Sequence, residues 1–549
     1  MNFKRLLLAL TLITAPLHAD IFDDYLNHEP HLVDLLDDTP DEHFEFMNDF
    51  MSTTPMLLKA LPDIAIVLFL LEIGAIDILE QDFFLSTNRP ARRSLLDMPL
   101  FQPNEALFPE PSFLNAQFFF NMTPRARFTR TSNNIDSYIA TSDPTLLAAL
   151  DAAIKKLRPI TGQALGFINI RSIMELVSMI TLVERNIGLM LQTGGRWDRM
   201  QLRIMFPIYY HERNFFLSQK NLDQLSLELG FSNPTTFDDS YAIADRLGVG
   251  DTRVEFGVHA LETQWTDMVI SLYATIPTAF TIARGLAGNT FCAPGTYPNV
   301  DFTTLYDTAE ALITGTVTPE QQAASFVIIQ TFLLEAWDRV AAALLDNGLG
   351  DEAHPGLGIC ATIDARFDQW VDQPWASCVY WHNRIAFEYL FQNDNKRFYI
   401  NNNNPANFDR DFTDPDQASE NLEFLQNEII NRICLLGLST KVQPGVIGMW
   451  KSALIFDDTE WNAYLGTDFW FQTKESHGCI HAEGDLVSTL SLCKSIMPWA
   501  FQNQIIGGFG YTYVIQNCSL TLGLDGAAAI FSTGVGHDFM ITLRLDTQF

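Results

Sequence analysis

The chain ends in the stretch Phe539-Met-Ile-Thr-Leu-Arg-Leu-Asp-Thr-Gln-Phe549, and this stretch decides the fold. Successive side chains of an extended strand point to opposite faces. The odd-numbered residues, which are mostly apolar, therefore share one face, and the mostly polar even-numbered residues share the other. The preceding segment, 519–531, repeats the alternation with the opposite parity. The pattern predicts two β-strands with one face suited to lipid or protein core and the other to water.

A final amphipathic strand that ends in Phe resembles the C-terminus of bacterial outer-membrane β-barrel proteins. The resemblance is to the class and to no single member. It implies an all-β fold, a transmembrane antiparallel up-and-down β-barrel in the outer membrane of a Gram-negative bacterium. It also implies two partners, outer-membrane lipid and the barrel-assembly machinery that reads the C-terminal strand. The alternative is the last hairpin of a soluble all-β protein.

The other end of the chain reads as an export signal. A basic start with Lys4 and Arg5 precedes an apolar run, 6–13, and small residues around Ala19. We therefore expect residues 1–19 to be a signal peptide. Loss of Lys4 and Arg5 takes the formal net charge from −32 to −34, which repels phosphate backbones and excludes nucleic acid as a partner.

No helical membrane anchor is expected after the leader. The longest clean apolar run, Ile64–Leu71, is bounded by Asp63 and Glu72. A spanning helix needs about 20 apolar residues. This run is far shorter, so it predicts a packed helix.

Twelve segments with period-two alternation follow, and their lengths suit tilted membrane strands. We expect about 12 strands, at 113–122, 183–193, 199–210, 253–261, 265–276, 357–368, 379–391, 446–456, 461–472, 505–515, 519–531 and 539–549. Pro207 indicates a bulge or a rim position in the third segment. Aromatic residues near segment ends would suit interfacial girdles, at Trp197, Trp265, Trp370, Trp375, Trp461, Trp470, Tyr511 and Tyr513.

The connections between these segments differ systematically in length. Those after even-numbered segments are short, beginning with a turn at Gly194-Gly195, whereas those after odd-numbered segments are long except for the last. One long connection contains an amphipathic helix over 319–345. Transmembrane barrels show this asymmetry, with short periplasmic turns and long outer loops. We therefore expect a barrel over 113–549 with helices in its long extracellular loops.

Residues 20–112 differ from the rest of the chain because they begin with an acidic stretch and continue with a helix-like segment. They predict an N-terminal helical domain in the periplasm, either an extension or a plug for the barrel. A helical subdomain that merely covers one end of the barrel is equally consistent with the sequence.

The sequence contains no catalytic or cofactor motif, so we expect no enzyme, no cofactor and no metal site. His481 and Glu483 lie close together, but such pairs are usually solvated loop residues. The seven cysteines lack a Cys-x-x-Cys pair. Cys479 and Cys493 lie in one expected outer loop and could form a disulfide in an oxidising compartment.

The inward faces of the expected strands carry charges of both signs. The candidate channel-lining residues are Arg203, Arg253, Glu255, Asp267, Asp364, Arg366, Arg384, Glu388, Asp468, Asp525, Arg544 and Asp546. Charges on wall strands are tolerated toward a wet or paired interior. At twelve strands, both a polar channel and a lumen filled by paired groups are consistent with this pattern.

The resulting hypothesis is a porin-like outer-membrane channel for passive passage of small hydrophilic solutes, with a preference for cations. One alternative is a surface-displayed barrel with an adhesin or structural role. The other is an outer-membrane or secreted hydrolase.

Overall fold

The computed structural model describes residues 93–98, 112–125, 182–228, 239–288, 290–299, 318–345, 348–400, 434–458, 460–482, 484–515 and 518–548. All of them belong to one compact unit, Asp63–Phe549. The predicted signal peptide and most of the predicted N-terminal domain lie outside the described residues, as does Phe549.

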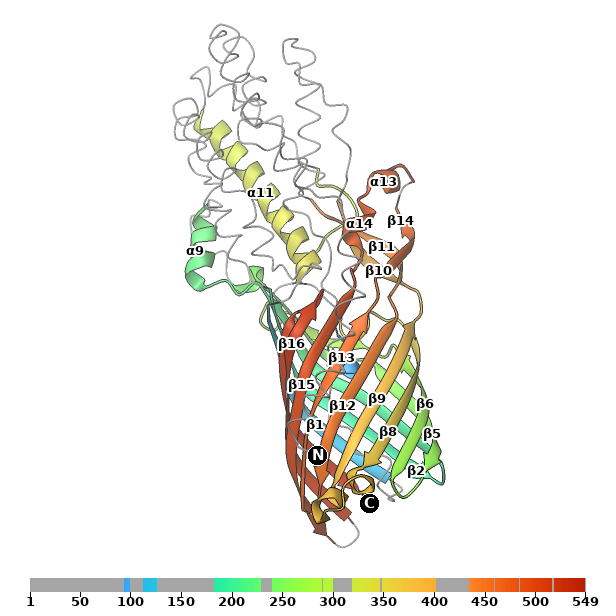
Figure 1. Cartoon of the computed structure of the whole chain (residues 1–549). Helices are drawn as coiled ribbons and strands as arrows, with labels where there is room; N and C mark the ends of the chain where they lie inside the picture. Colours follow the sequence, from blue (N-terminus) through green and yellow to red (C-terminus); the bar gives the residue numbers. More distant parts are fainter. Residues whose placement is uncertain are drawn as a thin grey trace, which may run out of the picture. The chain divides into compact units, whose positions relative to one another are not determined.

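Twelve described strands pair antiparallel in one closed ring (Figure 1). They are β1 (Ser112–Arg125), β2 (Val183–Trp197), β3 (Met200–Asn214), β5 (Thr252–Glu262), β6 (Thr266–Ile276), β8 (Gly356–Arg366), β9 (Val379–Leu390), β12 (Ile447–Asp457), β13 (Trp461–Gln472), β15 (Ala500–Ile515), β16 (Cys518–Thr533) and β17 (His537–Gln548). Each strand pairs with its sequence neighbours in the ring, and β1 with β17 closes it. The twelve predicted strands and the barrel fold are confirmed.

The outer surface of the ring is apolar, whereas the inner surface carries the buried charged and amide side chains beside a cluster of apolar ones. In β17, Leu543 is 58% exposed while its neighbour Arg544 is 3% exposed. The outward neighbours of Leu543 on the adjoining strands are Phe118 and Leu524, and both are exposed. A continuous exposed apolar belt of this kind is stable only against lipid.

The two ends of the ring differ as predicted. The end that we call the short-turn end carries brief connections such as 263–265 and 458–460, and the short 3-10 helices η6 (Phe367–Gln369) and η7 (Pro374–Cys378). The opposite end, the long-loop end, carries the long insertions. An even strand number, an apolar exterior and this asymmetry are the features of a bacterial outer-membrane barrel with periplasmic short turns.

Aromatic side chains mark the short-turn end. Trp197, Trp265, Trp370, Trp375 and Trp461 are all exposed there, as expected for an interfacial girdle. The expectation for Trp470 was wrong, because this side chain is fully buried on the inward face. It packs against residues such as Leu390 and Ile447 inside the barrel.

The predicted turn at Gly194-Gly195 was also wrong. Both glycines stay in β2 and pair with Arg203 and Leu202, and the chain turns at 198–199 instead. Asp198 adopts a left-handed conformation with φ of 55°, which Asp tolerates better than most residues. Gly194 serves close packing, since a Cβ there would lie 2.3 Å from the Leu202 carbonyl oxygen.

Pro207 occupies the point where β3 changes partner. Residues 200–205 of β3 pair with β5, and residues 208–214 pair with β4 (Ile243–Val249). Proline has no N–H to donate to a ladder, so a gap between two ladders suits it. Strand β4 in turn pairs with β7 (Phe280–Arg284) at the long-loop end. The predicted rim or bulge is therefore a switch of partner strand.

The long insertions build a second layer at the long-loop end. A three-stranded sheet contains β10 (Asn393–Tyr399), β11 (Leu436–Gln443) and β14 (Ser476–His481). The described helices there are α9 (Gln219–Glu228), η5 (Asp239–Tyr241), α11 (Pro319–Leu344), α13 (Gly484–Thr489) and α14 (Leu492–Ser495). A capping box at Thr318 starts α11. None of the described helices is long and apolar enough to cross a membrane.

Candidate functional site

The barrel lumen is the candidate site, because the predicted lining residues meet there. Ten of the twelve are buried and face inward, namely Arg203, Arg253, Glu255, Asp267, Asp364, Glu388, Asp468, Asp525, Arg544 and Asp546. Arg384 faces the same space and is slightly more exposed, at 12% of its side chain. Arg366 differs: it ends β8 at the short-turn rim and pairs with Asp368.

The central layer of the lumen is one carboxylate between two guanidinium groups. Glu255 Oε2 accepts from Arg203 at 2.5 Å and from Arg384 at 2.8 Å. The Cys360 thiol donates to the other oxygen, Oε1, at 3.2 Å. These groups come from β3, β5, β8 and β9, so the cluster joins four strands across the interior. Buried charges of this kind are stable only when paired.

A second cluster lies nearer the short-turn end. Arg544 donates to Asp525 at 3.1 Å and also pairs with Asp546, which accepts from Asn115 as well. Two imidazole–carboxylate pairs lie at the same end, His259 with Asp267 at 3.1 Å and His382 with Asp364 at 2.7 Å. Asp267 and Asp364 are directly opposite each other on β6 and β8.

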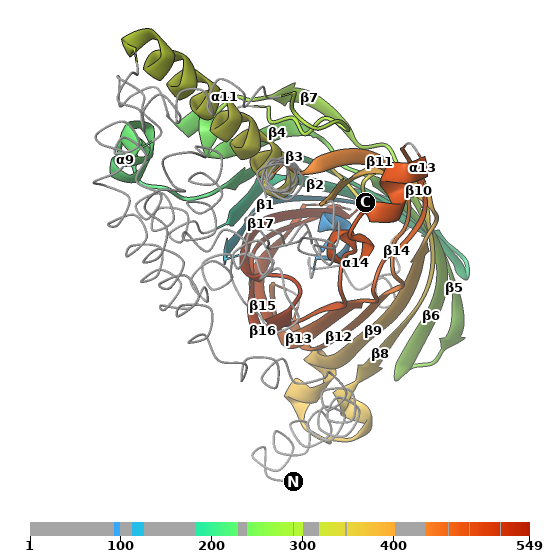
Figure 2. The same ribbon diagram turned by 90° about the horizontal axis from the view of Figure 1, so that it is seen from above.

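A short segment of the predicted N-terminal domain, Arg93–Met98, lies inside the ring of strands, as Figure 2 shows. Its one turn of 3-10 helix, η2 (Leu95–Asp97), is buried. Arg253 Nη2 pairs with Asp97 at 2.7 Å and with the wall residue Glu388 at 2.6 Å. Arg93 pairs with Asp468 at 2.5 Å. Both ends of the segment are thus tied to the wall by ion pairs.

The structure places further polar residues in the lumen that the sequence pattern does not reveal. Lys451 faces the lumen directly opposite Arg384 on one side and Asp468 on the other. The sequence does not indicate its position, because β12 carries apolar residues on both faces and alternation does not reveal the inward side. A belt of buried amides was overlooked because neutral side chains carry no charge signal: Asn115, Gln117, Asn121, Gln192, Gln502 and Gln504.

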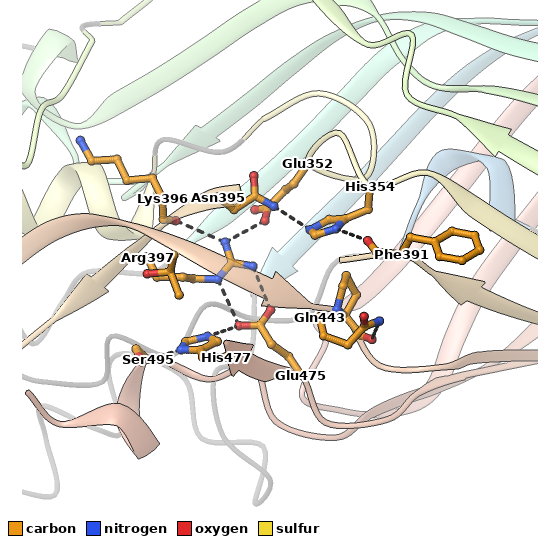
Figure 3. A network of polar contacts seen from close by, with 12 residues as sticks. Glu352, His354, Phe391, Asn395, Lys396, Arg397, Gln443, Glu475, His477 and Ser495 are labelled. Atoms are coloured by element: carbon orange, nitrogen blue, oxygen red, sulfur yellow. Dashed lines mark hydrogen bonds and ion pairs between the residues drawn. The ribbon is translucent and has the colours of Figure 1, made fainter. Parts of the chain in front are cut away.

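A polar network holds the outer sheet at the long-loop end, and Figure 3 shows it from close by. Arg397 of β10 pairs with Glu475 and with Glu352, each at 2.8 Å. Glu475 also accepts from His477 Nε2 at 2.7 Å. The loop that carries Glu352 leads into β8 of the barrel, so the network ties the outer sheet to the barrel rim.

Within this network, a hydroxyl, an imidazole and a carboxylate follow one another. Ser495 Oγ lies 3.5 Å from His477 Nδ1, and His477 Nε2 contacts Glu475. A catalytic serine would need an exposed hydroxyl that donates to the imidazole. Ser495 is instead buried, and its hydroxyl donates to the Leu492 carbonyl oxygen at 2.8 Å. The geometry is that of a structural network.

The network predicts that the outer sheet loses stability in acid. Burial alone raises the pKa of Glu475, but Arg397 and His477 outweigh burial and hold the pKa below its usual value. A lowered carboxylate pKa stabilises the fold above the unfolded-state pKa of about 4.3, and this stabilisation is lost as the pH falls through the folded-state value. We expect Arg397→Gln to raise the pH at which proteases cut the outer sheet.

Limited proteolysis between pH 7 and pH 4 checks this expectation. The control is His481→Gln, which removes only the exposed contact of His481 with Asp394 at 3.4 Å. Equal cleavage profiles for Arg397→Gln and His481→Gln would contradict the role of the network.

Two sequence predictions concern the outer loops. Cys479 lies exposed in β14, whereas the side chain of Cys493 lies outside the described residues, so the disulfide between them stays a prediction. Glu483 lies outside the described residues, and no described group of His, Cys, Asp and Glu could hold a metal ion.

No family model matches the sequence, and no curated protein matches it. Among solved structures, an outer membrane channel from Pseudomonas putida F1 is 9% identical, with 82% of this chain and 100% of that chain covered and a TM-score of 0.38. The Ralstonia pickettii toluene transporter TbuX is 8% identical, with 81% and 92% covered and a TM-score of 0.32. The translocator domain of the autotransporter NalP from Neisseria meningitidis is 5% identical, with 81% and 90% covered and a TM-score of 0.29. At these TM-scores the similarities do not indicate what the present chain transports.

Proposed function

We propose that the protein is an outer-membrane channel for passive passage of small hydrophilic solutes, with a preference for cations and no catalytic role. The observation that carries the proposal is that the barrel wall is apolar outside and places its charged and amide side chains inside. A barrel without a transport role could fill its interior with apolar side chains, which avoids the free-energy cost of removing charged groups from water. A wall lined with charges and amides is suited to polar solutes.

The preference for cations follows from the distribution of charge. The twelve candidate lining residues include five basic and seven acidic side chains, and Lys451 brings the two signs closer to balance. The formal charge of the whole chain is −32, so most of the acidic excess lies outside the wall. Acidic groups around a channel mouth concentrate cations there.

We expect a preference for K⁺ over Cl⁻ that is clear in dilute KCl and largely absent near 1 M KCl. The reason is that the Debye length falls to about 3 Å at 1 M salt, which screens charges in the loops. Reversal potentials across a KCl gradient, at low and at high mean concentration, measure this preference. A preference for anions, or a cation preference unchanged in molar salt, would place selectivity at a narrow internal site instead.

A surface-display role is the second candidate, and the size of the outer layer favours it. The layer contains a sheet of three strands and α11, a helix of 26 residues. Planar-bilayer conductance separates the two functions, because a display barrel conducts no ions in any variant.

A further inference from the structure

The segment Arg93–Met98 contacts the lumen wall as a bound peptide would. Its basic side chain, its acidic side chain and its apolar side chains each meet a different part of the wall. All six residues from Arg93 to Met98 are buried. The wall around it therefore forms three neighbouring subsites.

The first subsite accepts a cation. Arg93 Nη2 lies 2.5 Å from Asp468 Oδ2, and Arg93 Nη1 donates to the amide oxygens of Gln502 at 3.3 Å and Gln504 at 3.4 Å. The NH₂ groups of the same two amides donate to Asp538 at 2.7 and 2.6 Å. This orients both amide oxygens toward Arg93. Asp468, Gln502 and Gln504 are each at most 3% exposed, so the subsite is built into the wall.

The second subsite accepts an anion. Arg253 Nη2 pairs with Asp97, and Arg253 Nη1 donates to the Leu96 carbonyl oxygen at 3.0 Å. The Tyr273 ring lies under the Arg253 guanidinium, 4.7 Å from ring centroid to carbon. Arg253 thus recognises both a carboxylate and the peptide backbone beside it, the kind of forked recognition for which guanidinium groups are suited.

The third subsite is apolar. Leu95, Leu96 and Met98 belong to one buried cluster with inward side chains of the wall. These wall residues include Phe119, Met190, Met205, Tyr209, Ile455, Tyr464, Ile506 and Met540. The cluster draws on strands from opposite sides of the ring. It offers aliphatic and aromatic surface to whatever lies at the centre.

The wall charges of the first two subsites have partners of their own. Glu388 shares Arg253 Nη2 with Asp97, and it also accepts from the Thr275 hydroxyl. Lys451 is directly opposite Asp468 on the neighbouring strand, within the usual reach of a cross-strand pair. Withdrawal of Arg93 and Asp97 would therefore leave each wall charge beside an opposite charge. The subsites would persist without the segment.

From these contacts we propose that the lumen is a binding site for short peptides that join a basic and an acidic side chain across an apolar centre. In this structure the segment Arg93–Met98 occupies the site as a tethered ligand and closes the lumen. The inference rests on the proposed channel function and adds to it a solute class and a means of closure.

The test uses the full-length protein with Arg93→Gln and Asp97→Asn, which keep the side-chain size and remove both charges. The probe is a fluorescent peptide of sequence Arg-Ser-Leu-Leu-Asp-Met with blocked ends, and the control peptide is Gln-Ser-Leu-Leu-Asn-Met. We expect the probe to bind the variant at least about ten-fold more tightly than the control peptide, since charged hydrogen bonds are lost in the latter. Wild-type protein should bind the probe at least about ten-fold more weakly than the variant, because its own segment competes.

Two further measurements keep the result interpretable. A second variant, Leu95→Ser with Leu96→Ser, loosens the segment without touching its charges and should also bind the probe more tightly than wild type. Bilayer conductance of both variants should fall when the probe is added. If the variants conduct ions but neither bind the probe nor are blocked by it, the proposed peptide site is wrong and the channel function is unaffected. Selective binding without conductance would support the site and overturn the channel.

Discussion

Replacing Leu543 with Arg is expected to destabilise the folded barrel in a bilayer by about 2–4 kcal/mol if the residue lies near the midplane. Leu543 is 58% exposed and is flanked on both neighbouring strands by exposed apolar residues, Phe118 and Leu524. A guanidinium there would face lipid. In a soluble protein the same exposed position would tolerate Arg with a change of roughly 0.5 kcal/mol or less.

The measurement is the folded fraction in lipid vesicles across a urea series, read from heat-modifiable gel mobility. The matched control is Leu543→Ile, which keeps the apolar surface. Equal midpoints for the Arg and Ile variants would show that this face does not contact lipid.

Replacing Glu255 with Gln is expected to lower the free energy of unfolding by about 3–5 kcal/mol, the usual effect of removing one partner of a buried ion pair. Glu255 is the only carboxylate that the described contacts place between Arg203 and Arg384. Glutamine nearly matches its shape but leaves two buried guanidinium groups without the negative charge between them. The same urea series in vesicles measures the loss.

The control for this prediction is Glu262→Gln in the same strand. Glu262 pairs with Arg196 at 2.9 Å, but half of its side chain is exposed at the short-turn end. Exposed pairs contribute about 0–1 kcal/mol, so this variant should unfold close to wild type. If Glu255→Gln lowered the free energy of unfolding as little as Glu262→Gln does, the lumen around Glu255 would be open to water rather than closed.

The barrel is predictable from the sequence because residues that face lipid must be apolar, whereas the alternate residues that face the lumen can be polar. In β8 and β17 the alternation is nearly complete, and both strands were placed within one or two residues. Prediction weakened where that contrast is absent. β12 has apolar residues on both faces, which conceals Lys451. Gly194-Gly195 resembles a turn in the sequence, but both glycines stay in β2, where close packing explains Gly194.

The lining charges were found because charge on an alternating strand is a strong signal, but their pairing was not. Arg203 lies directly opposite Glu255 on the adjoining strand. Arg384 and Glu388, which pair with Glu255 and Arg253, come from β9, 129 and 135 residues away, and only the closed sheet brings them together. The same holds for the segment Arg93–Met98. Its position in the lumen depends on Arg253, Asp468 and Gln502, none of which its local sequence could indicate.

The most direct test of the account is planar-bilayer conductance of the wild-type protein beside a full-length variant in which residues 93–98 are replaced by Gly and Ser. We expect rare openings for wild type and frequent, stable conductance steps for the variant, because the variant lumen loses the segment and keeps the charged and amide side chains of its wall. Identical traces for the two proteins, with both folded as judged by heat-modifiable mobility, would contradict it.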